Sequence, residues 1–297
     1  MSTCYRLMNM ANTTFIIRPM DLNDIESGLR LSGAEGWNQT EKDWKLFLES
    51  PGNVCLAAEW DTKVIGTTTA INYSNQVAWI GMVLVDKEHR GRGVSKTLLT
   101  NVFKELDSCQ SIKLDATPMG QQVYKKLDFA DEYLVARMTN MSIRDLPFGY
   151  DDDILPEPIQ VKHIGEIIGM DELVFGTNRI PLIEYLIKEY PGKAWMLSRN
   201  NRIAGFALGR EGNKYHQIGP VMASNSEDAK MLITKSLAKL IDQPVVVDVL
   251  CDKEDLIDWL NSIGFIKQRH FIRMYKKENP FPGIISKQYL IAGPEFG

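Results

Sequence analysis

Residues 83–96 read Val83-Leu84-Val85-Asp86-Lys87-Glu88-His89-Arg90-Gly91-Arg92-Gly93-Val94-Ser95-Lys96. The apolar start predicts a strand, and the basic, glycine-bearing stretch predicts a turn. The apolar residues that follow predict one face of a helix: Leu98, Leu99, Val102, Phe103 and Leu106. The first N–H groups of such a helix lack partners and its dipole is positive there, which suits an anion. Gly91 and Gly93 allow close backbone approach, and Arg90 and Arg92 add charge, so this stretch predicts a pyrophosphate site.

Two common phosphate loops do not fit this stretch. A Walker A loop needs glycine where Arg90 and Ser95 stand. A dinucleotide fingerprint needs a third glycine where Lys96 stands, and no acidic residue follows at the end of a second strand.

A third pattern fits better. Residues Arg90 to Ser95 resemble the [QR]-x-x-G-x-[GAS] loop of the GNAT-type acyl-CoA N-acetyltransferases. Downstream, Thr117-Pro118 predicts a helix start after a strand at 112–116. Residues Tyr124 to Phe129 are similar to the Y-x-x-L-G-F signature of that family, with Asp128 in place of glycine. The stretch from Leu114 to Tyr124 resembles the same stretch in a bacterial subgroup of the family, whose members carry a second, divergent domain at the C-terminus. The family resemblance is strong in the N-terminal half of the chain and weak in the C-terminal half.

The resemblance implies acetyl-CoA as cofactor. The loop would cradle its pyrophosphate, and the preceding strand would lend its backbone to the pantetheine arm. The cofactor-binding residues implied are Met82, Val83, Leu84, Val85, Arg90, Gly91, Arg92, Gly93, Val94, Ser95 and Lys96. Tyr124 would be the general acid toward the coenzyme A sulfur, because a phenol can donate a proton to a thiolate. The family transfers acetyl by direct attack in a ternary complex.

The sequence indicates the general base and the pocket for the substrate amine less clearly than it indicates the cofactor site. Asp115 lies near the C-terminal end of its predicted strand, where ligands gather in α/β sheets. Either it takes a proton through water or it only orients the turn at Thr117, and both interpretations stay open. Glu59 is a weaker candidate. The glycine-rich segment between the first two predicted helices supplies the expected substrate-binding residues, Glu35, Trp37 and Asn38.

The order of elements occurs twice along the chain. Strands at 54–60 and 64–73, the strand–turn–helix, a further strand and helix, and a last strand at 133–141 form the first copy. Hairpin strands at 194–198 and 202–209 begin the same order in the second copy, which ends in a strand at 271–275. We therefore expect an α/β fold of the α+β mixed type, with two tandem GNAT-like domains. Each would hold a mostly antiparallel mixed sheet flanked by helices, at residues 12–145 and 159–297, with a linker at 146–158.

The second copy lacks the chemistry of the first. Its turn, residues 224–228, has no glycine and no basic residue, and the carboxylates of Glu227 and Asp228 would repel a pyrophosphate. Leu260 stands where the first copy has Tyr124. The second copy is expected to be a scaffold that shapes the substrate cleft or a dimer surface. The tail, residues 281–297, is expected either to fold over the first domain or to complete the second sheet.

Composition narrows the class of protein. The net charge is −4, from 34 basic and 38 acidic residues, which argues against general nucleic-acid binding. Four widely spaced cysteines and four scattered histidines predict neither a disulfide framework nor a metal site. No signal sequence and no membrane-length apolar run is evident, so a cytoplasmic location without membrane association is expected. A homodimer is left open.

These features lead to one expected function and its rivals. The expected function is acetyl-CoA-dependent N-acetyl transfer to a primary amine of a small molecule. A protein N-terminal or lysine acetyltransferase is the alternative within the class. A non-catalytic acetyl-CoA sensor or scaffold, and a structural protein that binds no coenzyme A, are the alternatives outside it.

Overall fold

The computed structural model describes residues 15–144, 146 and 155–297, which fall into two compact units divided between Ile112 and Lys113. Most of the predicted linker, at 147–154, lies outside the described residues. The mixed α/β fold, with mostly antiparallel sheets flanked by helices, is confirmed. Within the described part of the chain, no helix is long and apolar enough to cross a membrane.

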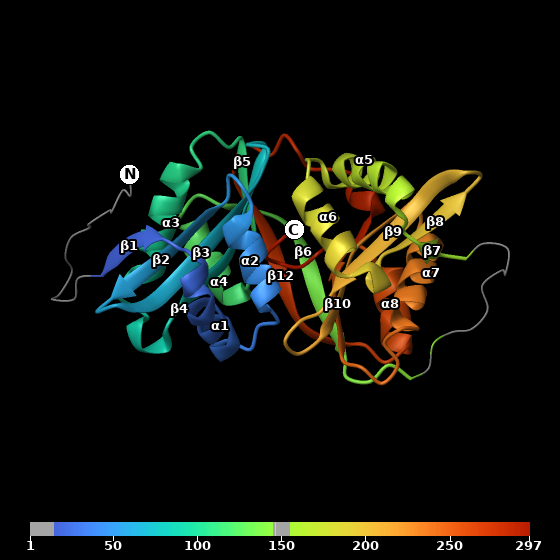
Figure 1. Ribbon diagram of the computed structural model, residues 1–297, viewed down its shortest axis with the longest axis horizontal. Helices are drawn as coiled ribbons and strands as arrows, with labels where there is room; N and C mark the ends of the chain where they lie inside the picture. Colours follow the sequence, from blue (N-terminus) through green and yellow to red (C-terminus); the bar gives the residue numbers. More distant parts are fainter. Residues whose placement is uncertain (1–14, 145, 147–154) are drawn as a thin grey trace. The chain divides into compact units, whose positions relative to one another are not determined.

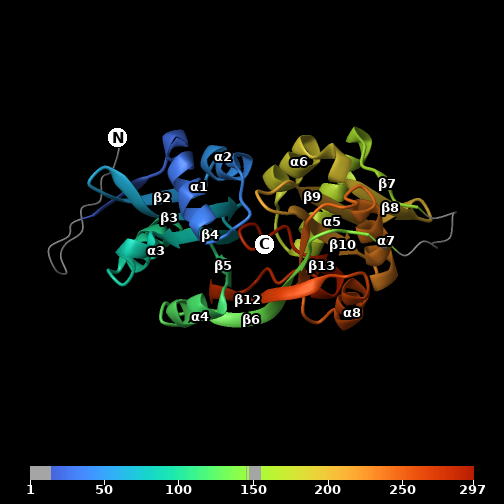
Figure 2. The same ribbon diagram turned by 90° about the horizontal axis from the view of Figure 1, so that it is seen from below.

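The first unit is built on an antiparallel sheet. Its strands are β1 (Ile16–Pro19), β2 (Val54–Trp60), β3 (Lys63–Tyr73) and β4 (Val77–Val85), paired in chain order. Helices α1 (Ile25–Ala34) and α2 (Glu41–Glu49) lie on one face, and α3 (Val94–Glu105) lies on the other (Figure 2). Thr40 caps α2 through the backbone N–H of Asp43, and this orients Trp44 and Phe47 into the core, where both are fully buried.

The second unit contains the larger sheet. Its strand order is β5-β12-β6-β11-β13-β10-β9-β8-β7. Figure 1 labels these strands except β11 and β13. The strands are β5 (Ser111–Ala116), which begins just before the boundary, β6 (Ala130–Asn140), β7 (Glu157–Pro158), β8 (Trp195–Arg199), β9 (Arg202–Arg210), β10 (His216–Ala223), β11 (Val245–Leu250), β12 (Ile266–Lys277) and β13 (Gln288–Leu290). The helices are α4 (Pro118–Lys125), α5 (Ile164–Phe175), α6 (Ile180–Glu189), α7 (Ser226–Leu237) and α8 (Glu254–Ser262).

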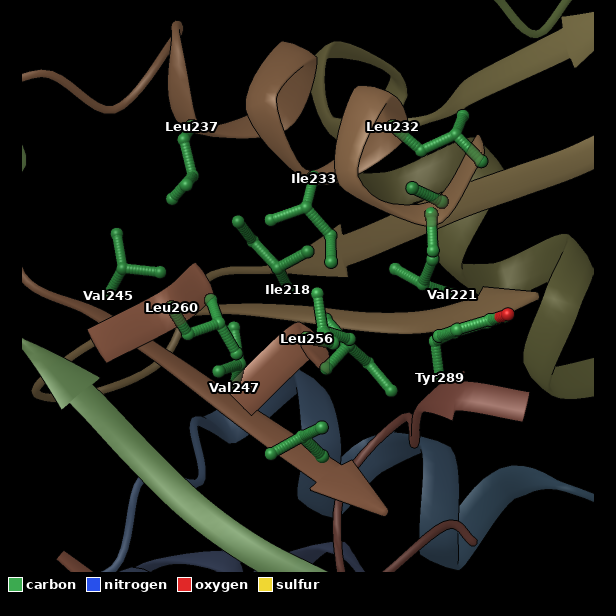
Figure 3. Packing of buried hydrophobic residues seen from close by; sticks show 14 of the residues in the cluster. Ile218, Val221, Leu232, Ile233, Leu237, Val245, Val247, Leu256, Leu260 and Tyr289 are labelled. Atoms are coloured by element: carbon green, nitrogen blue, oxygen red, sulfur yellow. The ribbon is translucent and has the colours of Figure 1, made fainter. Parts of the chain in front are cut away.

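The core of this unit lies between α7, α8 and the strands β10 and β11 (Figure 3). Leu232 and Ile233 of α7 meet Leu256 and Leu260 of α8 there, all with no exposed surface. Leu260 is thus a core residue at the position that Tyr124 holds in the first copy.

The two copies exchange their last strands. β6 is the last strand of the first copy, and its second half, residues 135–140, pairs antiparallel with the whole of β11. β12 pairs with β6 on its other side. Val135 faces Phe271 at the centre of the β6–β12 pair. Because β6 lies between two strands of the second copy, the compact unit that contains it starts at Lys113 and not at the linker. The predicted domain limits follow the sequence repeat and remain a prediction.

The tail completes the second sheet, which is one of its two predicted placements. β10 and β11 pair directly only where His216–Ile218 face Val245–Val247, and farther along β13 pairs with both strands. The fit is close, since a Cβ on Gly219 (φ 145°) would lie 1.9 Å from the carbonyl oxygen of Ile291. The main chain of the tail therefore forms part of the fold.

Candidate functional site

The predicted anion loop forms an open cradle at the start of α3. Gly91 and Gly93 have φ of 76° and 78°, a left-handed conformation that only glycine adopts at little cost. A Cβ at either position would meet no atom within 4 Å. Within the described residues, no hydrogen bond is formed by the backbone N–H groups of Gly93, Val94 or Ser95. With no acidic residue in its first turn, α3 presents a free, positive N-terminus.

Strand β4 is distorted just before this loop. Met82 has φ of 49°, and the register against β3 shifts between Thr67 and Thr69. The hydroxyl of Thr67 donates to the Met82 carbonyl at 2.9 Å, which holds the bulge. Bulges re-aim backbone groups and are frequent next to active sites. The sequence places Met82 to Val85 on this strand, but it carries no signal for the bulge itself.

Arg90 is held at the entrance of the loop by Glu35. Its guanidinium donates to a Glu35 oxygen at 2.6 Å and to the Val85 carbonyl at 3.2 Å, and Lys87 lies 3.9 Å from the same carboxylate. Glu35, which is predicted to bind the substrate amine, therefore neutralises positive charge of Arg90 and Lys87 beside the loop. Its role toward the acceptor stays a prediction, as do those of the half-buried Trp37 and the buried Asn38.

Asp86 fixes the start of the loop. It accepts from the backbone of Glu88 and pairs with Arg30 at 3.0 Å and Lys63 at 3.3 Å. Burial works to raise its pKa, but these hydrogen bonds and cations lower it to about 2. Ligand atoms of Asp86, Glu88 and His89 lie within 4.8 Å of one another, although Arg30 and Lys63 already balance the Asp86 charge.

We expect Asp86→Asn to lower the free energy of unfolding by about 1 kcal/mol at pH 7, allowing for solvent screening. The carboxyl pKa is lower in the folded chain than its unfolded value of about 3.9. Its contribution is therefore complete above about pH 4 and is lost as the pH falls towards 2. Urea denaturation of both proteins at pH 7, 4 and 3 measures this, and a difference that stays constant with pH would contradict it.

Tyr124 lies on α4, in the second unit. Thr117 caps this helix through the backbone N–H of Gly120 at 3.1 Å, and Pro118 is its first residue, as predicted. The half-buried Tyr124 ring packs edge-on against Phe129, with 5.7 Å between centroids. Burial raises the pKa of its phenol, which therefore stays protonated at neutral pH. Within the described part of the chain, its hydroxyl has no hydrogen-bond partner.

Asp128, which replaces the glycine of the family signature, ends this segment. Its φ of 64° is left-handed, which explains why the family uses glycine here. Aspartate is among the few other residues that tolerate this conformation. The departure from the signature thus leaves the backbone path after α4 intact.

Asp115 is completely buried and paired. Both its oxygens accept from the Arg273 guanidinium at 2.9 Å, and Arg273 also donates to the Tyr133 hydroxyl. Burial opposes the charge on Arg273, but Asp115 outweighs it and raises the Arg273 pKa. This geometry favours the orienting role over the role of base, which stays a prediction. Glu59, the other candidate, accepts from Arg18 at 2.6 Å.

In the second copy, residues 224–228 correspond to the anion loop, and their own side chains occupy the start of α7. Asn225 caps α7 by accepting from the backbone N–H of Asp228. Asp228 is buried in the first turn and pairs with Arg199 at 2.6 Å. This helix start already has an anionic partner from its own chain.

Comparison with known proteins identifies both copies. Residues 22–129 match the model of the acetyltransferase (GNAT) family, and residues 167–290 match an acetyltransferase (GNAT) domain model. The chain belongs to the GNAT acetyltransferases. It is a tandem GNAT protein, and membership of this family makes it an N-acetyltransferase, as predicted.

Relatives of this tandem GNAT protein match nearly its whole length. The holothin acyltransferase of a Pseudoalteromonas strain is 24% identical over 99% of this chain and 98% of its own. An uncharacterized N-acetyltransferase of Bacillus subtilis is 25% identical over 85% of this chain and 88% of its own. A crystal structure from Pyrococcus horikoshii shares the fold, with a TM-score of 0.81, 21% identity and 99% coverage of both chains.

Proposed function

We propose that this tandem GNAT protein transfers the acetyl group of acetyl-CoA to a primary amine of a small molecule. The observation that carries the proposal is the free N-terminus of α3 behind two left-handed glycines. Its backbone N–H groups, the open space before it and the charge of Arg92 fit a pyrophosphate. Bound acetyl-CoA would supply the activated thioester.

Tyr124 acts as general acid in this proposal. The C–N bond to the amine forms as the C–S bond breaks, and the electron pair leaves with the sulfur. Tyr124 donates its phenolic proton to that sulfur, since a phenol carries its proton at neutral pH. The amine must lose a proton in the same reaction, and no side chain is assigned to that step.

A small-molecule acceptor is favoured over a broad set of protein amines. One relative that matches the whole chain is named for a single acceptor, holothin. The segment with Trp37 and Asn38 remains the segment that we propose to contact the amine substrate. A non-catalytic acetyl-CoA binder would show binding without turnover.

The test is a thermal-shift titration with acetyl-CoA. A ligand at a hundredfold excess over its Kd adds roughly 2.7 kcal/mol to the free energy of unfolding, so the wild-type Tm should rise clearly. Gly93→Trp should abolish the rise, because its side chain fills the space before α3.

Gly93→Ala is the matched control for this titration. Both variants carry a left-handed strain of about 1–2 kcal/mol, but alanine adds only a methyl group. Gly93→Ala should therefore keep most of the ligand response. If wild type gives no response, or if Gly93→Trp responds like wild type, acetyl-CoA does not bind at this loop.

A further inference from the structure

The helix that carries Tyr124 is weakly held by its own packing. α4 has eight residues, and none of their side chains is fully buried. A helix of this length is marginal in water, so its position depends on tertiary contacts, and the polar side chains of the helix itself contribute the exposed contacts of Gln121 and Lys125 with Asp131. Both ends are in fact contacted by one strand, β12, which belongs to the second copy.

The first contact lies just before α4 begins. Asp115 stands two residues ahead of the Thr117 cap, and Arg273 of β12 binds both its oxygens. The pair is almost completely buried, with side-chain exposures of 2% for Arg273 and 0% for Asp115. Its charge-assisted, bidentate geometry restricts where the end of β5, and so the start of α4, can lie.

The second contact lies just after α4 ends. The Lys276 ammonium of β12 donates to the Leu127 carbonyl at 2.7 Å and lies 3.3 Å from an Asp128 oxygen. This carbonyl follows the last turn of α4, where backbone acceptors lack partners within the helix. Arg273 and Lys276 therefore hold the two ends of the helix from one strand.

The same construction recurs in the second copy with the strands exchanged. Arg137 of β6 binds both oxygens of Asp248 at 2.8 Å, and Asn140 of β6 donates to the Ile263 carbonyl, which follows α8, at 3.0 Å. The helix held there carries Leu260 instead of a tyrosine. The molecule thus contains an internal copy of the arrangement with an apolar residue, Leu260, at the position of Tyr124.

We propose that β12 positions the general acid of the first copy, with Arg273 and Lys276 as positioning residues. This inference rests on the proposed role of Tyr124. The second copy would then contribute to the reaction through β12, although side chains of its own occupy the helix start that corresponds to the anion loop. Misplacing a reacting group by about 1 Å can cost on the order of a hundredfold in rate, so loosening α4 should lower kcat.

The experiment compares Lys276→Met with its internal counterpart Asn140→Leu. Each variant removes the hydrogen bond to the carbonyl after a helix and one further contact, with Asp128 for Lys276 and with the Ser142 N–H for Asn140. Both variants leave the buried ion pairs intact. Lys276→Met should lower kcat about tenfold or more with little change in the KM for acetyl-CoA. Asn140→Leu should keep kcat within about twofold. Lys276→Arg, which can still donate, should restore most of the rate.

Two further measurements separate positioning from general loss of stability. Hydrogen exchange should increase at residues 118–125 in Lys276→Met and at residues 254–262 in Asn140→Leu. In a Tyr124→Phe background, Lys276→Met should lower kcat no further, because the acid that it positions is already absent.

The outcomes distinguish the inference from the function on which it rests. Full turnover by Lys276→Met beside an impaired Tyr124→Phe would overturn the positioning role alone. Equal losses in Lys276→Met and Asn140→Leu would also overturn it, because a structural defect would then suffice. Full turnover by Tyr124→Phe would overturn the proposed acid itself.

Discussion

We expect Tyr124→Phe to lower kcat by about 10²- to 10⁴-fold, the usual contribution of a general acid, if Tyr124 has its proposed role. The departing thiolate loses its proton donor, while the ring and its packing on Phe129 remain. Stability should change little, because the hydroxyl has no hydrogen-bond partner within the described residues. Release of free thiol at saturating acetyl-CoA and amine measures the effect.

Tyr289→Phe is the control for this substitution. The Tyr289 phenol is also buried, with a raised pKa, but it lies on β13 in the second copy. Its loss should leave kcat unchanged. If Tyr124→Phe keeps the wild-type kcat, another group protonates the sulfur.

Asp115→Ala is expected to lower the free energy of unfolding by about 3–5 kcal/mol. It leaves the Arg273 guanidinium buried beside Tyr133 without its carboxylate partner. An unpaired buried charge is much more costly than the loss of the ion pair as a whole. Urea denaturation of the whole chain, followed by circular dichroism, measures the change.

The double variant Asp115→Ala/Arg273→Met tests that explanation. It removes both charges and replaces the guanidinium with an apolar side chain, so most of the lost stability should return. Strictly additive losses would show that the ion pair is not the origin of the effect.

Local features of this fold could be predicted from the sequence. Gly91 and Gly93 predict a turn before a helix, and both adopt the left-handed conformation that requires glycine. Thr117-Pro118 predicts a capped helix start and forms one. These signals are short-range, because the residues that specify each feature lie within a few positions of it.

Long-range partners could not be predicted. Nothing in the pattern of β6 or β12 shows that the two strands exchange places, because alternating apolar residues specify a face and not a neighbour. The sequence therefore carries no sign that Arg273, 158 residues away, binds both oxygens of Asp115. The contact of Glu35 with Arg90 could not be predicted for the same reason, since it joins separate elements, and the substrate-binding role of Glu35 stays a prediction.

The tail strand β13 also affects whether the second copy could bind a ligand as the first copy is proposed to do. Replacing residues 224–228 with the glycine-bearing, basic segment 90–95 would supply glycines and charge, but β13 would still lie between β10 and β11. An extended ligand arm could enter there only by displacing backbone that carries Tyr289 and Leu290 into the core. Because main chain occupies this position in the sheet, point substitutions within residues 224–228 would not open a gap between β10 and β11.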